Sequence, residues 1–255
     1  MSPGLVSIVG AGLGDPELVT LKGAARLRAA QAVVHDALVL PGLLALAAPT
    51  AELFNVGKRD RRHALPQEEI NRLLVHLSRA GRRVVRLKGG DPFLFGRGGE
   101  EGDALASAGL PWEMIPGISS CLAAPAYAGI PVTDRRVSSM VTVVTGNACV
   151  GAGPGVDWGR ISPQGTLVVL MGLGNLGDIC ARLLFEGWPP GTPAALLSSM
   201  SWSGERVIVS DLSGLPAAAV GDVEAPAVIV VGEVVRLRER LSWRRNHVES
   251  LCAGR

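Results

Sequence analysis

The first half of the chain alternates short apolar runs with segments of helical periodicity. The runs LVSIV, AVVH and RRVVRL are rich in β-branched residues and fit strands. Between them lie TLKGAARLRAA and PQEEINRLLVHLSRA, and the second predicts a helix from Pro66 to Ala80, closed by Gly81. Its apolar positions recur at helical spacing: Ile70, Leu73, Leu74 and Leu77. This alternation predicts an α/β domain with a largely parallel sheet.

The pattern restarts after Tyr127. There AGIPVTDRRVSS, a stretch with prolines and charges, precedes a new set of apolar runs. Five of these fit strands, VTVVT, TLVVLM, AALLS, ERVIVS and PAVIVVG, with GDICARLLFEG as an intervening helix. No short-period repeat is present, which excludes solenoids and propellers. We therefore predict two α/β domains, 1–134 and 135–245, followed by a tail, 246–255.

Composition and charge narrow the classes of function. The 255 residues are 47% hydrophobic, enough for a substantial core. With 25 basic and 23 acidic side chains the net charge is only +2, which indicates neither nucleic acid nor an anionic membrane as partner. The first residues lack the basic region of a secretory signal, and the uncharged stretch 114–133 contains prolines and glycines that would break a spanning helix. We expect a cytoplasmic protein without a transmembrane segment.

The cysteines and histidines are scattered. The cysteines form no CxxC pair and are too few for a disulfide scaffold of this length: Cys121, Cys149, Cys180 and Cys252. The histidines show no metal-ligand spacing: His35, His63, His76 and His247. We therefore expect no protein-bound metal.

Two glycine-rich turns resemble dinucleotide-binding motifs. In the first, Gly10–Pro16, Asp15 stands where the third glycine should be, and its charge would repel a pyrophosphate. The second, Gly172–Gly177, satisfies GxGxxG, but 194–199, about 20 residues later, contains no acid to bind the ribose. A nicotinamide oxidoreductase therefore stays open as a less supported alternative.

The stretch VVRLKGGDPFLFGRGGEE, residues 84–101, holds two glycine loops close together. At Gly89–Pro92 bare backbone can approach a flat ligand, while Asp91 offers a carboxylate to hydroxyls or to a cation. A simple β-turn would explain Asp91 and Pro92 equally well. A simple β-turn would not require the second glycine loop, Gly96–Gly99, so the presence of both loops favours ligand binding.

With these motifs the chain resembles the uroporphyrinogen-III C-methyltransferases, within the wider tetrapyrrole methylases. The resemblance runs in order from about Leu5 to Val235 and includes GAGLGDPELVTLKGAARL, AVVHDALV, GKRDRRHALPQEEIN, VVRLKGGDPFLFGRGGEE, MIPGISS, AYAGIP, MGL and PAVIVVGEVV. The third and fourth of these segments are the most diagnostic. The resemblance implies two α/β domains, each a mostly parallel sheet flanked by helices, with the active site in the trough between them.

The resemblance also implies S-adenosylmethionine as cofactor, with S-adenosylhomocysteine as its product. Matching positions assign cofactor residues in both halves of the chain: Leu13, Gly89, Gly90, Asp91, Leu94, Ser119, Ser120, Met171, Met200 and Ala227. An electron-rich pyrrole carbon takes the methyl group, and a proton must then leave the macrocycle. The resemblance assigns Asp36 as the proton acceptor and Lys58 as the proton donor.

The implied reaction methylates C2 and C7 of uroporphyrinogen III to give precorrin-2, for sirohaem or cobalamin synthesis, in a homodimer. The substrate carries a carboxylate on every arm, which calls for basic side chains, arginine above all. The loop candidates are Arg59, His63, Arg97 and Arg136, with Arg97 and Arg136 first. Two other functions stay open: a tetrapyrrole methylase acting later in corrinoid synthesis, which should lack the two diagnostic segments, and a non-catalytic cofactor sensor.

Four residues depart from the family pattern. Leu13 stands where proline is usual, Met200 where glycine is usual, Asp134 where histidine is common and Glu205 where glutamine is usual. Met200 is the largest change, because its flexible side chain can fill space that glycine leaves open beside the cofactor. The sequence therefore allows an altered cofactor affinity.

Overall fold

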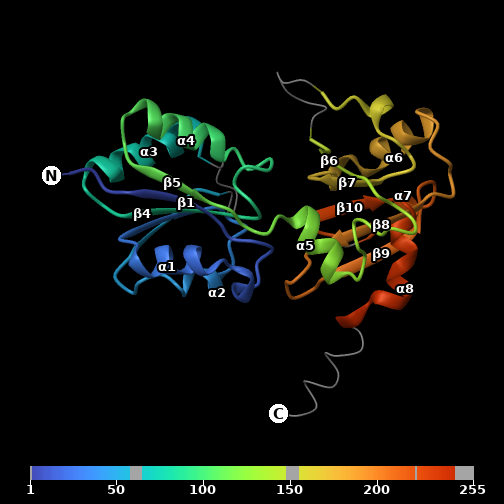
Figure 1. The fold of residues 1–255 in the computed structure, drawn as a ribbon, viewed down its shortest axis with the longest axis horizontal. Coiled ribbons are helices and arrows are strands. Elements are labelled where there is room, and N and C mark those ends of the chain that lie inside the picture. The colour runs from blue at the N-terminus through green and yellow to red at the C-terminus, as the bar shows by residue number, and fades with distance from the viewer. Residues whose placement is uncertain (1, 58–64, 148–154, 222, 245–255) are drawn as a thin grey trace, which may run out of the picture. The chain divides into compact units, whose positions relative to one another are not determined.

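The computed structural model describes residues 2–57, 65–147, 155–221 and 223–244 (Figure 1). The chain forms two compact units, Met1–Ser119 and Ser120–Arg255. The first unit ends upstream of the boundary at 134 that the sequence suggested. The helix that begins the second unit, α5 (Ser120–Tyr127), contacts strands β7 and β10 of that unit. No helix in the described ranges has the length and apolar character needed to span a membrane.

The first unit is built on a five-stranded, fully parallel sheet in the order β3-β2-β4-β1-β5. Its strands are β1 (Val6–Gly10), β2 (Ala32–His35), β3 (Glu52–Asn55), β4 (Val84–Lys88) and β5 (Trp112–Ile115). Figure 1 shows α1 (Leu21–Ala29) and α2 (Pro41–Leu44) on one face of this sheet, and α3 (Gln67–Arg79) and α4 (Gly98–Ser107) on the other. The short helix η1 (Pro16–Leu18) precedes α1. The parallel sheet predicted for this half is confirmed.

Successive strand residues of the first unit point into two different cores, one on each face of the sheet. Toward α3 and α4 lie Val6, Ile8, Val34 and Val84, together with the predicted apolar stripe of α3. Toward α1 and α2 lie Val9, Val33, Val85 and Leu87. Within the stripe, Ile70, Leu74 and Leu77 are buried and Leu73 packs at the edge. Each such side chain contributes roughly 1.5–3 kcal/mol through burial.

The second unit also holds a five-stranded sheet, in the order β6-β7-β10-β8-β9. Its strands are β6 (Val141–Thr145), β7 (Thr166–Leu170), β8 (Pro193–Ser198), β9 (Arg206–Asp211) and β10 (Ala227–Val231). Only the β6–β7 pair is parallel, so the expectation of a mostly parallel sheet here is wrong. The physical reason is that β10 inserts, in the opposite direction, between β7 and β8, and that β9 follows β8 after a connection too short for a parallel crossover.

Helices cover the second sheet and complete its core. On one face α6 (Leu176–Phe185) and α7 (Leu215–Ala218) pack Ile179, Leu183 and Leu215 against β7, β8 and β10. The 3-10 segments are η2 (Trp158–Arg160), η3 (Leu173–Asn175) and η4 (Glu233–Leu237), and α8 (Arg238–Leu241) follows η4 directly. The predicted strands and the intervening helix of this half are therefore present.

A cluster of charged groups fastens β5 to the neighbouring elements of the first unit. Glu113 on β5 accepts hydrogen bonds from the Arg26 guanidinium and from Ser7 Oγ at 2.9 Å, and its other oxygen lies 2.7 Å from Lys22 Nζ. The hydrogen bond from Arg26, with those from Lys22 and Ser7, lowers the pKa of Glu113 from 4.5 to about 2. The ionised carboxylate therefore stabilises the fold.

Replacing Glu113 by Gln should destabilise the protein by about 1–2 kcal/mol near neutral pH, after allowance for solvent screening. Because folding lowers the pKa of this group, its contribution is present above the unfolded pKa and is lost as pH falls toward about 2. The difference in melting temperature between wild type and Glu113→Gln should therefore shrink between pH 5 and pH 3. Glu68→Gln, which removes an exposed pair with Arg72, is the control and should change little. A difference that stays constant with pH would contradict the prediction.

Candidate active site

Three loops meet at the carboxyl edge of the first sheet, after β1, β4 and β5. The connection after β1 leads to β2 on one side, whereas the connection after β4 leads to β5 on the other side. The neighbouring strands β1 and β4 therefore form a topological switch point, where open α/β sheets bind ligands. The first glycine loop and the stretch 89–97 lie at this point.

The backbones of these loops are in direct contact. Gly90 N donates to Gly12 O at 2.8 Å, and Gly12 N donates to Gly90 O at 3.2 Å. A Cβ on Gly117, after β5, would lie 2.3 Å from Gly90 O and 2.7 Å from the Cα of Gly10. The loops can approach this closely only because Gly10 and Gly117 lack a Cβ, and Gly12 and Gly90 have the positive φ angles that favour glycine.

Asp91 joins two of the loops. Its Oδ1 accepts from Phe93 N at 2.8 Å, which shapes the turn, and its Oδ2 accepts from Gly117 N at 3.1 Å, which links the loop after β4 to the loop after β5. The structure thus brings the first-unit members of the predicted cofactor set to one sheet edge: Leu13, Gly89, Gly90, Asp91, Leu94 and Ser119.

The other predicted cofactor residues belong to the second unit. Met171 follows β7, Ala227 begins β10, and Met200 follows β8. The pairings of Val228 with Leu170 and of Ala227 with Ser198 place these three at the same end of the second sheet. The fourth residue, Ser120, is the first residue of α5 and of the second unit.

The two methionines of this set differ in exposure. Met171 is 47% exposed, so its side chain can meet a ligand, whereas Met200 is 4% exposed. The side chain that replaces the usual glycine is therefore mostly taken up inside the protein.

Backbone strain concentrates in the same loops. In the described ranges, five residues other than glycine have a positive φ: Phe95, Arg97, Met171, Ser199 and Ser201. The first two follow Asp91, and the other three follow β7 and β8. Residues held in this conformation cost free energy and cluster at functional sites.

Asp36, the predicted proton acceptor, directly follows β2. Its Oδ1 lies 2.5 Å from Arg86 Nη2, and its Oδ2 lies 3.9 Å from Lys88 Nζ. The side chain keeps 30% of its surface exposed. The predicted proton donor and two of the predicted substrate ligands lie outside the described residues: Lys58, Arg59 and His63.

A buried charge network that the sequence analysis missed lies behind Asp36. Arg86 and Lys88 alternate along β4 and face α4, where Glu101 is completely buried. Glu101 Oε1 lies 2.9 Å from Arg86 Nε and 2.9 Å from Lys88 Nζ, and it accepts from Gln67 Nε2 at 3.3 Å. Glu101 Oε2 has no hydrogen-bond partner among the described residues. The sequence signal for this network was the segment RLK, which places two basic residues on the same face of an otherwise apolar strand.

The two arginines first expected to bind the substrate are both in ion pairs. Arg97 donates to both oxygens of Glu100, at 2.8 and 2.7 Å, which lowers the pKa of Glu100. Arg136 donates to both oxygens of Asp134, at 2.9 and 2.8 Å, and these bonds hold the pKa of Asp134 well below its usual range. Both arginine side chains are more than half exposed, so incoming anions can reach them.

The second glycine motif is not packed as a dinucleotide loop. A Cβ on Gly172 would crowd three side-chain methyl groups, of which Ile229 Cδ1, at 2.9 Å, is the nearest. A Cβ on Gly174 or Gly177, in contrast, would meet nothing within 4 Å. In the dinucleotide motif the later glycines allow close approach of the ligand and of the helix. These open surroundings weaken the nicotinamide alternative.

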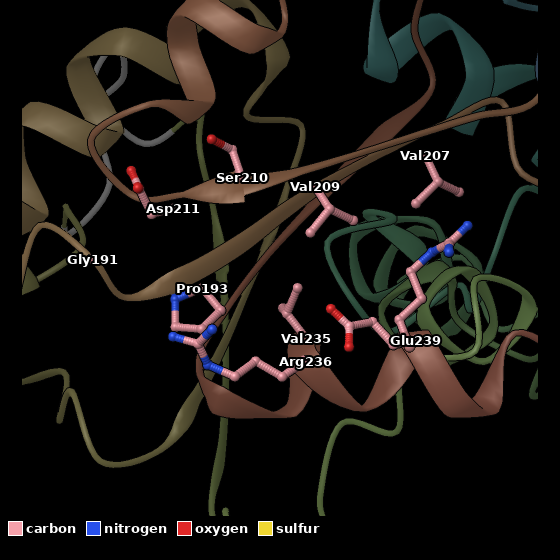
Figure 2. A pocket seen from close by; sticks show the side chains of 10 residues that line it. Gly191, Pro193, Val207, Val209, Ser210, Asp211, Val235, Arg236 and Glu239 are labelled. Atoms are coloured by element: carbon pink, nitrogen blue, oxygen red, sulfur yellow. The ribbon is translucent and has the colours of Figure 1, made fainter.

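The second unit contains a cavity of about 480 Å³ between β9 and the segment η4–α8. Figure 2 shows Val207, Val209 and Asp211 of β9 on one side of it, with Val235 and Glu239 of η4 and α8 on the other. None of the predicted site residues that the structure describes lines this cavity. Within the described part of the chain, no three His, Cys, Asp or Glu side chains are arranged to hold a metal ion.

Comparison with known proteins identifies the family. Residues 5–216 match the family described as Tetrapyrrole (Corrin/Porphyrin) Methylases. The siroheme synthase of Azotobacter vinelandii is 48% identical over 242 residues, which cover 94% of this chain and 52% of that protein. The chain thus spans about half the length of the curated relatives it matches.

Solved structures give the same result over the whole fold. The uroporphyrin-III C-methyltransferase of Thermus thermophilus, in complex with S-adenosylhomocysteine, is 40% identical with a TM-score of 0.79, covering 92% of this chain and 94% of that one. A cobalt precorrin-4 methyltransferase is 25% identical with a TM-score of 0.80, covering 91% and 95%. The chain belongs to the tetrapyrrole methylases.

Proposed function

We propose that this protein transfers methyl groups from S-adenosylmethionine to C2 and C7 of uroporphyrinogen III, giving precorrin-2 and S-adenosylhomocysteine for sirohaem or cobalamin synthesis. The observation that carries the proposal is the match, over almost the whole chain, to a uroporphyrin-III C-methyltransferase whose structure contains S-adenosylhomocysteine. The likeness to siroheme synthases supports the same substrate. The proposal concerns methyl transfer alone, because the chain corresponds to half of those proteins.

The residues of the first unit fit the cofactor. The contact of Gly10, Gly90 and Gly117 leaves bare backbone at the sheet edge, where a flat adenosyl group can approach closely. Asp91 supplies a carboxylate, and we propose that the exposed Met171 covers an apolar part of the ligand. The bound cofactor supplies an electrophilic methyl group.

The proton that leaves the macrocycle needs an acceptor, and we assign this role to Asp36. Its Oδ1 is held by Arg86, while its Oδ2 accepts no hydrogen bond from the described residues and its side chain is partly exposed. An oxygen of this kind can take a proton from a carbon acid placed against it. Lys58 is proposed as the donor on the resemblance alone.

The carboxylate arms of the substrate are proposed to bind Arg97 and Arg136, with Arg59 and His63 as further ligands. Both described arginine side chains are more than half exposed, and each guanidinium already binds a carboxylate through two hydrogen bonds, the geometry that a substrate carboxylate would also use. A homodimer in the cytoplasm is proposed on the resemblance alone, and light scattering of the purified protein tests the dimer.

The 25% identity to a cobalt precorrin-4 methyltransferase favours one other function, methylation of a later corrinoid. Mass analysis after anaerobic incubation with uroporphyrinogen III and S-adenosylmethionine separates the two. We expect the mass of two added methyl groups. Asp36→Ala should lower kcat by about 10²–10⁴-fold, as for loss of a general base. Unchanged substrate mass, with cofactor bound, would contradict the substrate assignment and favour a later corrinoid or a sensor.

The glycine contact yields a prediction about cofactor binding. S-adenosylhomocysteine at 100 times its Kd should stabilise the wild type by about 2.7 kcal/mol, and NAD should not stabilise it. Gly117→Ala forces the loops apart and should remove most of this stabilisation. Gly174→Ala, whose Cβ meets nothing, is the matched control and should behave as wild type. Circular dichroism without ligand shows whether Gly117→Ala is folded. Stabilisation by NAD instead would overturn the assignment of the cofactor.

A further inference from the structure

The buried network of Arg86, Lys88 and Glu101 is expensive as a device for stability. The three charged residues are at most 3% exposed, and each buried charge carries a large desolvation penalty. The network also leaves Glu101 Oε2 without a partner among the described residues, a further cost that a purely structural cluster avoids. Buried charges arranged at such cost next to a sheet edge indicate a role at the site.

The geometry shows what Glu101 does to its neighbours. Lys88 Nζ has two carboxylates within reach, Glu101 Oε1 at 2.9 Å and Asp36 Oδ2 at 3.9 Å. Lys88 Nζ is therefore bound by Glu101, the closer of the two carboxylates. Glu101 also binds Arg86 through Nε, so that Nη2 of the same guanidinium is directed to Asp36 Oδ1.

We propose that Glu101 is a positioning residue for Asp36: it holds Lys88 away from Asp36 Oδ2 and orients Arg86 onto Oδ1. One oxygen of Asp36 is thereby fixed, and the other stays available to the substrate. This inference rests on the proposed role of Asp36 as proton acceptor. It assigns Glu101 and Lys88 an effect on the reaction that acts through Asp36 and needs no contact with the substrate.

Without the charge of Glu101, the buried Lys88 loses its nearest counter-charge. Asp36 is then the only carboxylate of the network, and a small movement brings Nζ into hydrogen-bond distance of Oδ2. With Lys88 bound to Oδ2, both oxygens of Asp36 are occupied and the carboxylate is drawn inward from the exposed edge. Loss of Glu101 should therefore reduce turnover much more than cofactor binding.

The test compares four variants of the full chain. Glu101→Gln should lower kcat for methyl transfer by about 10- to 100-fold, as for a misplaced reacting group, with the Kd for S-adenosylhomocysteine changed by less than about threefold. Asp103→Asn, an exposed acid on the same helix, is the matched control and should retain wild-type kcat. Asp36→Asn sets the level expected when the acceptor itself is lost.

The double variant Lys88→Met/Glu101→Gln distinguishes positioning from a structural role. It removes both the cation Lys88 and the carboxylate Glu101, so that the summed charge of Arg86, Lys88, Glu101 and Asp36 stays at zero, as in the wild type. We expect its kcat to recover at least about tenfold over Glu101→Gln, whereas a structural defect should worsen with a second buried substitution. Wild-type kcat in Glu101→Gln, or no recovery in the double variant, would overturn the proposal.

A crystal structure of Glu101→Gln provides a readout that does not depend on turnover. Lys88 Nζ should lie within hydrogen-bond distance of Asp36 Oδ2, and an unchanged position of Lys88 would sink the proposal even if activity falls. If Lys88 moves but Asp36→Asn retains wild-type kcat, the assignment of Asp36 as acceptor has failed, while Glu101 still controls the position of Lys88. The failures of the two proposals are thus distinguishable.

Discussion

The contact of three backbones at Gly10, Gly90 and Gly117 is the constraint on which the edge of the first sheet depends. Because no side chain separates these loops, the strands β1, β4 and β5 end at one place and their following residues share one surface. The mutual hydrogen bonds of Gly12 and Gly90, and the bond from Gly117 to Asp91, are possible only at this separation. The same closeness leaves unshielded backbone for a ligand, so packing and recognition come from one property, the absence of Cβ atoms.

A second constraint is the period of two along β4. Val85 and Leu87 point into the core formed with α1 and α2, so Arg86 and Lys88 must point toward α4. There a single carboxylate, Glu101, meets both cations. The buried charged side chains of β4 therefore extend to Asp36, which directly follows β2. Taking charges out of water costs more than the ion pairs return in many proteins, which makes orientation a better explanation of this network than stability.

Local periodicity was enough to predict α3, α1 and most strands, because their apolar positions are determined by the face they bury. It was not enough for α4, whose first turn contains glycines, or for the direction of β10, which depends on a pairing between distant segments. Motifs and the family resemblance predicted the candidate residues at the edge of the first sheet. The described ones among them lie together at that edge. Arg86, Lys88 and Glu101 escaped prediction because charged residues are rarely buried, and only three-dimensional pairing shows that these are.

The ion pairs of Arg97 with Glu100 and of Arg136 with Asp134 bear on how a carboxylate-rich substrate could be admitted. Exposed pairs contribute little to stability, because water and salt screen both charges. A substrate carboxylate can therefore replace Glu100 or Asp134 at little cost, while in its absence the arginines are kept in extended, bidentate geometry. Asp134 is the less exposed acid of the two, so water screens its pair with Arg136 less than it screens the pair of Glu100 with Arg97. On the proposed role of Arg136 as a substrate ligand, the departure from the family pattern at residue 134 bears on substrate affinity.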